Sequence, residues 1–105
     1  MPMKDYSFAE IRKWVCKEPE SEYLNFGEVE HVAHCLELIV DWYFDRLPHY
    51  DLDPFILAVL RNDFSDACGQ ADNTNARVLP VYAKFLYNNL PLDYKTKAGK
   101  QFGRR

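Results

Sequence analysis

The chain has 105 residues, of which 48% are hydrophobic and 15% aromatic, and its formal net charge is −3. This size and composition predict one compact domain with a single core, and they exclude a two-domain protein and a wholly disordered chain. The sequence contains no run of about 18 apolar residues, and Met1 to Asp5 lack the apolar stretch of a signal peptide. We therefore expect a soluble cytoplasmic protein with no membrane role.

The negative charge is concentrated between Glu18 and Asp53, where ten carboxylates stand against one cation, Arg46, a formal charge of −9. Residues 1–94 carry −8 in total, because five cations and no acid lie in residues 95–105. A negative surface attracts cationic partners and repels phosphate. The folded body is therefore expected to bind a basic protein surface and no nucleic acid directly.

The first helix is predicted from about Phe8 to Glu18. Ser7 and Glu10 have the spacing of a capping box, in which each side chain satisfies a free backbone N–H group at the helix start. Apolar residues then recur at helical spacing. Pro19 ends the helix, because the residue before a proline avoids helical geometry.

A longer helix is predicted from Phe26 to about Arg46, with Asn25 and Glu28 as its capping box and a proline, Pro48, after its end. One of its faces is broadly apolar. Another face carries polar residues at spacings of three and four, which we call the acidic strip: Glu30, His34, Glu37, Asp41 and Asp45. Like charges four residues apart oppose helix formation by about 0.2–0.5 kcal/mol each, so a role other than stability is expected for this strip.

Two further helices are predicted. Asp53 as N-cap and Pro54 at the first helical position start a buried helix that ends or bends near Gly69. The fourth helix follows a polar stretch and extends to about Asn89. Because Pro80 lies inside this pattern, the helix either starts just before the proline or has a kink or a frayed first turn there, and we favour the kink or frayed turn.

The predicted fold class is all-α: a compact bundle of about four helices. No sustained alternation of apolar and polar residues and no Asn-Gly or Asp-Gly hairpin signal is present. Residues 1–94 form the single predicted domain. Residues 95–105 contain Phe102 as their only large apolar residue, so they are predicted to form a flexible, disordered basic tail.

The three cysteines, Cys16, Cys35 and Cys68, are an odd count and are widely spaced within apolar patterns. This arrangement favours reduced thiols in a reducing compartment over a disulfide framework. We expect these thiols to be mostly buried.

The segment from Glu28 to Asp41 is the best candidate for a metal site, because Glu28-x-x-His31 has the spacing found in di-iron bundles. Such a site needs a second Glu-x-x-His motif, which the fourth helix lacks. A zinc site at His31 and Cys35 lacks two clear further ligands. No nucleophile motif and no Gly-rich phosphate loop is present either. We predict no catalytic residues, no metal and no cofactor.

The segment from Phe55 to Pro91 resembles a family of short, uncharacterised proteins encoded by bacteriophages and prophages. The residues that carry the resemblance are Asn62-Asp63, Ala67, Ala71-Asp72, Asn75, Phe85-Leu86-Tyr87-Asn88-Asn89 and Pro91. Similar sequences continue past the last proline with tryptophan and a Gly-Ser-Pro turn, whereas this chain continues with Leu92-Asp93-Tyr94-Lys95. The resemblance implies a phage or prophage origin and no catalytic residues.

The favoured hypothesis is a non-enzymatic, phage-encoded protein that antagonises a host defence or nucleic-acid-handling complex, such as a CRISPR or restriction effector. Its expected contact residues are Glu28, the acidic strip and Trp42, with Trp42 as an exposed aromatic anchor and core packing of this side chain left open. Carboxylates would compete with phosphates for lysine and arginine side chains. The alternative is a structural or accessory homo-oligomer, dimeric through the second or third helix. A third hypothesis is an enzyme or metalloprotein using the Glu28 to Asp41 segment.

Overall fold

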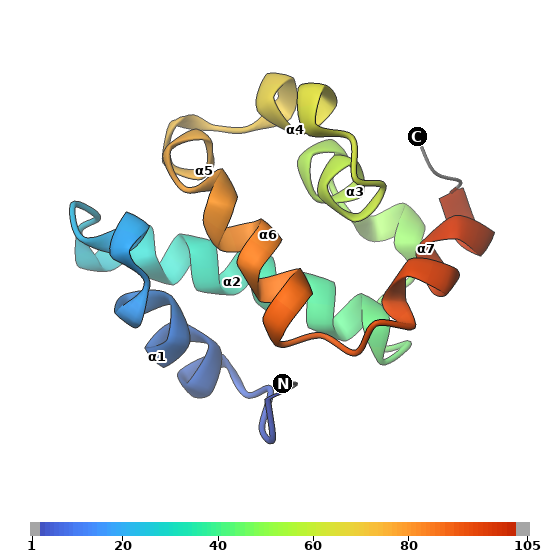
Figure 1. Ribbon diagram of the computed structural model, residues 1–105, viewed down its shortest axis with the longest axis horizontal. Helices are drawn as coiled ribbons and strands as arrows, with labels where there is room; N and C mark the ends of the chain where they lie inside the picture. The colour runs from blue at the N-terminus through green and yellow to red at the C-terminus, as the bar shows by residue number, and fades with distance from the viewer. Residues whose placement is uncertain (1–2, 103–105) are drawn as a thin grey trace.

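The computed structural model describes residues 3–102. Within this range the chain forms seven α-helices and two 3-10 turns and no strand, which confirms the predicted all-α class. The helices are α1 (Phe8–Lys17), α2 (Phe26–Tyr43), α3 (Pro54–Leu60), α4 (Phe64–Gln70), α5 (Asn73–Arg77), α6 (Leu79–Asn88) and α7 (Tyr94–Phe102). The 3-10 turns are η1 (Pro19–Ser21) and η2 (His49–Asp51). Figure 1 shows α2 running through the molecule, with α1 along one side and α6 crossing it.

Three of the predicted helix starts are confirmed. The Ser7 hydroxyl accepts a hydrogen bond from the Glu10 backbone N–H at the start of α1. Both halves of the Asn25 and Glu28 capping box are formed at the start of α2. At the start of α3 the Asp53 carboxylate accepts from a backbone N–H group, with a proline in the first turn. These caps satisfy donors that the first turn of a helix leaves free, so they fix each boundary locally.

The predicted bundle of about four helices is not confirmed, because the third and fourth predicted helices are each divided in two. Asn62 adopts a left-handed backbone conformation (φ 59°) that ends α3, and Asp63 then caps α4. Asparagine tolerates this conformation better than most residues. In the fourth helix, α5 is a short separate turn and α6 begins at Leu79, just before Pro80. The favoured kink is therefore wrong, since the proline occupies the first turn, where its missing N–H costs nothing.

The prediction of a disordered tail from residue 95 is also not confirmed as far as residue 102, and residues 103–105 lie outside the described range. Tyr94 to Phe102 form α7. Tyr94 and Ala98 are buried and Phe102 packs against the core, so one face of the helix, at spacings of four, is anchored. Counting large apolar residues alone missed this face, because Tyr94 stood at the assumed domain boundary and alanine was not counted.

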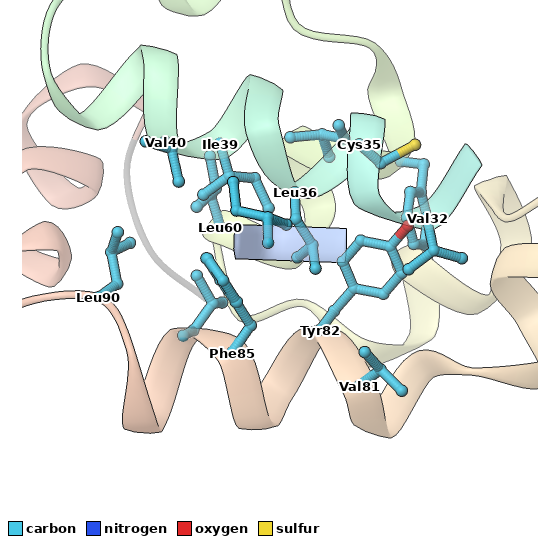
Figure 2. Close-up of a cluster of buried hydrophobic side chains, with 14 of the residues drawn as sticks. Val32, Cys35, Leu36, Ile39, Val40, Leu60, Val81, Tyr82, Phe85 and Leu90 are labelled. Atoms are coloured by element: carbon cyan, nitrogen blue, oxygen red, sulfur yellow. The ribbon is translucent and has the colours of Figure 1, made fainter. Parts of the chain in front are cut away.

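The core is centred between α2 and α6. Figure 2 shows side chains from the two helices pointing toward one another, with Leu60 of α3 beside them. Leu36 and Ile39 from α2 and Phe85 from α6 are fully buried. The Phe55 and Tyr82 rings pack edge to face at 5.1 Å between centroids, which adds directional packing to area burial. Among residues 3–102, no helix is long and apolar enough to cross a lipid bilayer.

All three cysteines are free, and only Cys35 is buried. The expectation of mostly buried thiols is therefore wrong for Cys16 and Cys68, which are exposed on α1 and α4. Each lies on the outward side of a short amphipathic helix, where neighbouring apolar residues in the sequence point inward.

Candidate functional site

The acidic strip lies mostly on α2. Glu30, His34, Glu37 and Asp41 belong to this helix and are half-buried or exposed. Asp45 does not continue the helical ridge, because α2 ends at Tyr43 and Asp45 has a left-handed backbone (φ 63°). α2 contains four carboxylates and neither lysine nor arginine. Every cation that neutralises the strip must therefore come from another segment of the chain.

Ion pairs with these distant segments partly neutralise the strip. The distances are 3.5 Å for Arg12 with Glu30, 3.0 Å for Arg46 with Asp41, 3.8 Å for His34 with Glu37 and 2.5 Å for Lys97 with Asp45. In each pair at least one side chain is well exposed, and such pairs contribute only about 0–1 kcal/mol. The carboxylates are thus held in position by contacts that an external cation can replace at little cost.

Trp42 is not an exposed anchor. Its side chain is 1% exposed, and its indole N–H donates a hydrogen bond to Gln101 at 2.7 Å. The Phe102 ring packs against it at 5.8 Å between centroids. Trp42 therefore holds α7 against α2. Its position three residues after buried Ile39 places it on the apolar face, a signal that the sequence contained.

The end of α2 is closed by a lysine from α7. The Lys97 ammonium group donates to the backbone carbonyls of Trp42 at 2.6 Å and Tyr43 at 3.1 Å, and it lies 4.9 Å from the centre of the Trp42 ring. A cation at a helix C-terminus satisfies free carbonyls and interacts favourably with the helix dipole. No spacing rule links Lys97 to α2, so the sequence alone gave no sign of this contact.

Glu28 and His31, the pair with di-iron spacing, connect α2 to α5. Glu28 forms an ion pair with Arg77, and its pKa is lowered, mainly by the backbone N–H of Asn25 and further by Arg77. His31 Nε2 lies 2.7 Å from the Asp72 carboxylate. In the described part of the chain, no three His, Cys, Asp or Glu side chains are grouped so that they hold a metal ion.

A second acidic region lies in the turn after α1. Lys84 of α6 pairs with Glu18 at 3.3 Å and with Glu20 at 2.9 Å. The hydrogen bond from Lys84 lowers the pKa of Glu20, and the same contact raises the pKa of Lys84. One cation therefore stands against two carboxylates, and Glu22 beside them is exposed. This region keeps a net negative charge.

Two aromatic side chains project near the N-terminal end of α2. Tyr23 is 85% exposed and Phe26 is 70% exposed. The Arg12 guanidinium carbon lies 5.8 Å from the centre of the Phe26 ring, and the same guanidinium group pairs with Glu30. Exposed aromatic rings next to carboxylates resemble the anchors of protein interfaces. Sequence analysis assigned Phe26 to the apolar face, although its place directly after the N-cap leaves it at the edge of that face.

The buried polar groups link helices and are chemically inert. The Tyr82 hydroxyl donates to Asn75 Oδ1 at 2.6 Å, and Asn75 Nδ2 lies 3.9 Å from Cys35 Sγ. Burial raises the pKa of Cys35 and that of Tyr82. Both groups are therefore protonated at neutral pH, and neither has the lowered pKa of a reactive nucleophile.

The predicted dimer surfaces on the second and third helices are not available. The apolar residues of α2 and α3 are largely packed inside, including Leu36, Ile39, Phe55 and Ile56. No protein-family model, curated protein or solved structure matches this chain. The functional interpretation consequently rests on the geometry of the acidic strip and on the side chains around it.

Proposed function

We propose that this protein is a non-enzymatic, phage-encoded antagonist that binds a basic surface of a host defence or nucleic-acid-handling complex, such as a CRISPR or restriction effector. The binding surface is the acidic strip, with Tyr23 and Phe26 in place of Trp42 as aromatic anchors. The observation that carries the proposal is that α2 presents four carboxylates and no cation of its own.

Replaceable ion pairs make such a surface ready for binding. The strip's carboxylates are oriented by Arg12 and Arg46, yet each of these pairs is solvent-exposed and weak. A lysine or arginine of the partner can take the place of either guanidinium group, which then returns to water. Because the carboxylates are already positioned, binding loses little side-chain entropy.

Competition with nucleic acid supplies the antagonism. A groove that binds DNA or RNA holds phosphates with lysine and arginine side chains. Carboxylates on a rigid helix compete for the same side chains, so occupation by this protein excludes the nucleic acid. Electrostatic binding of this kind weakens steeply as the ionic strength rises, since the Debye length falls from about 10 Å at 0.1 M to about 3 Å at 1 M salt.

A pull-down from host lysate tests the proposal with a matched pair of variants. Glu37 and Asp66 are both half-buried acids on helices, one in the strip on α2 and the other on α4. Glu37→Lys and Asp66→Lys change the net charge equally, so they differ only in place. We expect Glu37→Lys to weaken capture of the partner by about tenfold or more, as loss of an interfacial charge pair does, and Asp66→Lys to leave it intact.

Salt dependence gives a second readout in the same experiment. Capture of the partner should be lost in about 1 M salt, where charge interactions across more than a few ångströms are screened. A partner that stays bound in high salt, or that binds Glu37→Lys as well as the unchanged protein, contradicts the proposal. So does a lysate that yields no partner.

A further inference from the structure

The outer side of α6 is bordered by two hollows that form one groove. A hollow of about 370 Å³ lies between α6 and the α3–α4 segment, and a second of about 220 Å³ lies between α6, the end of α3 and the start of α7. Both are lined by Asn62, Ala83 and Leu86, so they are continuous. We call this feature the α6 groove.

Large apolar side chains project around the α6 groove without a cover. Phe64, which lines the larger hollow, is 73% exposed, and Tyr87, which lines the smaller one, is 77% exposed. Pro80, Ala83 and Tyr87 are all exposed and lie three or four residues apart, so the solvent side of α6 is an apolar stripe. A contiguous apolar surface of this kind marks a protein interface.

Charge identifies the occupant that this groove admits. Its lining contains two cations, Arg61 and Lys95, and one acid, Asp63. The groove thus has a formal charge of +1 in a chain whose net charge is −3. Two copies that met through the acidic strip would repel each other, whereas two copies that met through the α6 groove would not.

The exposed area is of the size that a small homodimer needs. A stable interface buries about 800 Å² on each partner, which is about an eighth of the 6163 Å² surface of the chain. Phe64 and Tyr87 are three-quarters exposed, and at roughly 150–250 Å² for each aromatic side chain they supply about 300 Å² together. Leu92 and the outer side of α6 extend the same surface.

We propose that the α6 groove is the contact surface of a symmetric homodimer whose two-fold axis passes near Ala83. A two-fold interface must fit itself, and this one does so because a projecting ring and a hollow lie on opposite sides of the axis. Phe64 of each copy enters the smaller hollow of the other copy, which is walled by Leu60, Leu86 and Leu92. The small side chain of Ala83 lets the two α6 helices approach to about 8–10 Å between their axes.

Light scattering coupled to size-exclusion chromatography tests this dimer on the full chain. The measured mass should rise from 12.4 kDa toward twice that value as the protein concentration increases from about 1 µM to about 200 µM. Ala83→Arg should raise the dimer dissociation constant by more than about tenfold, as expected at the centre of an interface. Ala9→Arg, at an exposed alanine of α1, is the matched control and should leave the dissociation constant unchanged.

A second pair of variants tests the projecting ring. Phe64→Ser should weaken the dimer, whereas Phe26→Ser, which removes an equally exposed ring on α2, should not. Circular dichroism checks that each variant is folded. A protein that remains monomeric at about 200 µM overturns the proposal, and so does a dimer that is weakened equally by a variant and its control.

Cross-linking tests the position of the axis without relying on a weakened dimer. In a Cys16→Ser, Cys68→Ser background, Ala83→Cys should form a disulfide-linked dimer on mild oxidation, because residues at a two-fold axis bring their Cα atoms to within about 7 Å. Ala9→Cys should remain monomeric. A dimer in which Ala9→Cys cross-links and Ala83→Cys does not rules out this axis.

Discussion

Replacing Lys97 with methionine tests how α7 is held on the body. The Lys97 side chain is only 18% exposed, and its ammonium group lies at the C-terminal end of α2, against two backbone carbonyls and the Asp45 carboxylate. Methionine keeps most of the side-chain volume and removes the charge and all three donors. The substitution therefore isolates the electrostatic and hydrogen-bonding part of the contact.

The expected cost follows from the separate contributions of this ammonium group. A cation at a partly buried helix C-terminus contributes up to about 2 kcal/mol, and its position over the Trp42 ring adds about 0.5–1 kcal/mol. The exposed pair with Asp45 adds little. We therefore expect Lys97→Met to lower the free energy of unfolding by about 2–3 kcal/mol.

Urea unfolding followed by tryptophan fluorescence measures this loss, with Lys100→Met as the control. Lys100 is an exposed lysine of the same helix, so its substitution should change the free energy of unfolding by less than about 0.5 kcal/mol. Amide hydrogen exchange should also become faster in residues 94–102 of Lys97→Met. Equal stability of the two variants, or unchanged exchange in this segment, would refute the reasoning.

Three other predictions concern packing, backbone geometry and pH. Trp42→Ala should destabilise the protein by about 3–5 kcal/mol in urea unfolding, because it leaves a cavity under α7, and a cost below about 1 kcal/mol would show that this side chain is not buried. Asn62→Gly should be close to neutral, whereas Asn62→Ala should cost about 1 kcal/mol, since alanine is strained at φ 59°; equal stabilities of the two variants would contradict the left-handed turn. The folded pKa of Glu20 lies below its ordinary value of 4.5, so its contribution to stability is present above pH 4.5 and is lost as the pH falls through the folded pKa. Lys84→Met, which removes the cause, should flatten this acid-side loss in unfolding curves recorded across that range, and an unchanged curve would contradict the assignment.

Local signals in the sequence predicted the helix starts correctly. Ser7, Asn25 and Asp53 cap helices where the patterns placed them. A cap involves residues within one turn of each other, so its chemistry can be derived from adjacent positions. The same argument applies to the apolar face of α2, which is a property of a single helix.

Helix breaks and long-range contacts were not predictable by the same means. Asn62 ends α3 through a backbone conformation that asparagine tolerates without requiring it, so the residue type alone did not decide between a continuous and a divided helix. The neutralisation of the acidic strip involves Arg12 and Lys97, which are far from their partners in sequence. Consequently the carboxylates of the strip were predicted, whereas the cations paired with them and the burial of Trp42 under α7 depended on tertiary packing.

The claim that the acidic strip is the binding surface is tested most directly by labelling carboxylates in the complex with the captured partner. Carbodiimide-activated labelling modifies exposed Asp and Glu side chains, and mass spectrometry then locates each modified residue. The account predicts that Glu30, Glu37 and Asp41 become less reactive when the partner binds, while Asp66 on α4 keeps its reactivity. Unchanged reactivity along the strip, or protection of Asp66 in its place, would contradict the account.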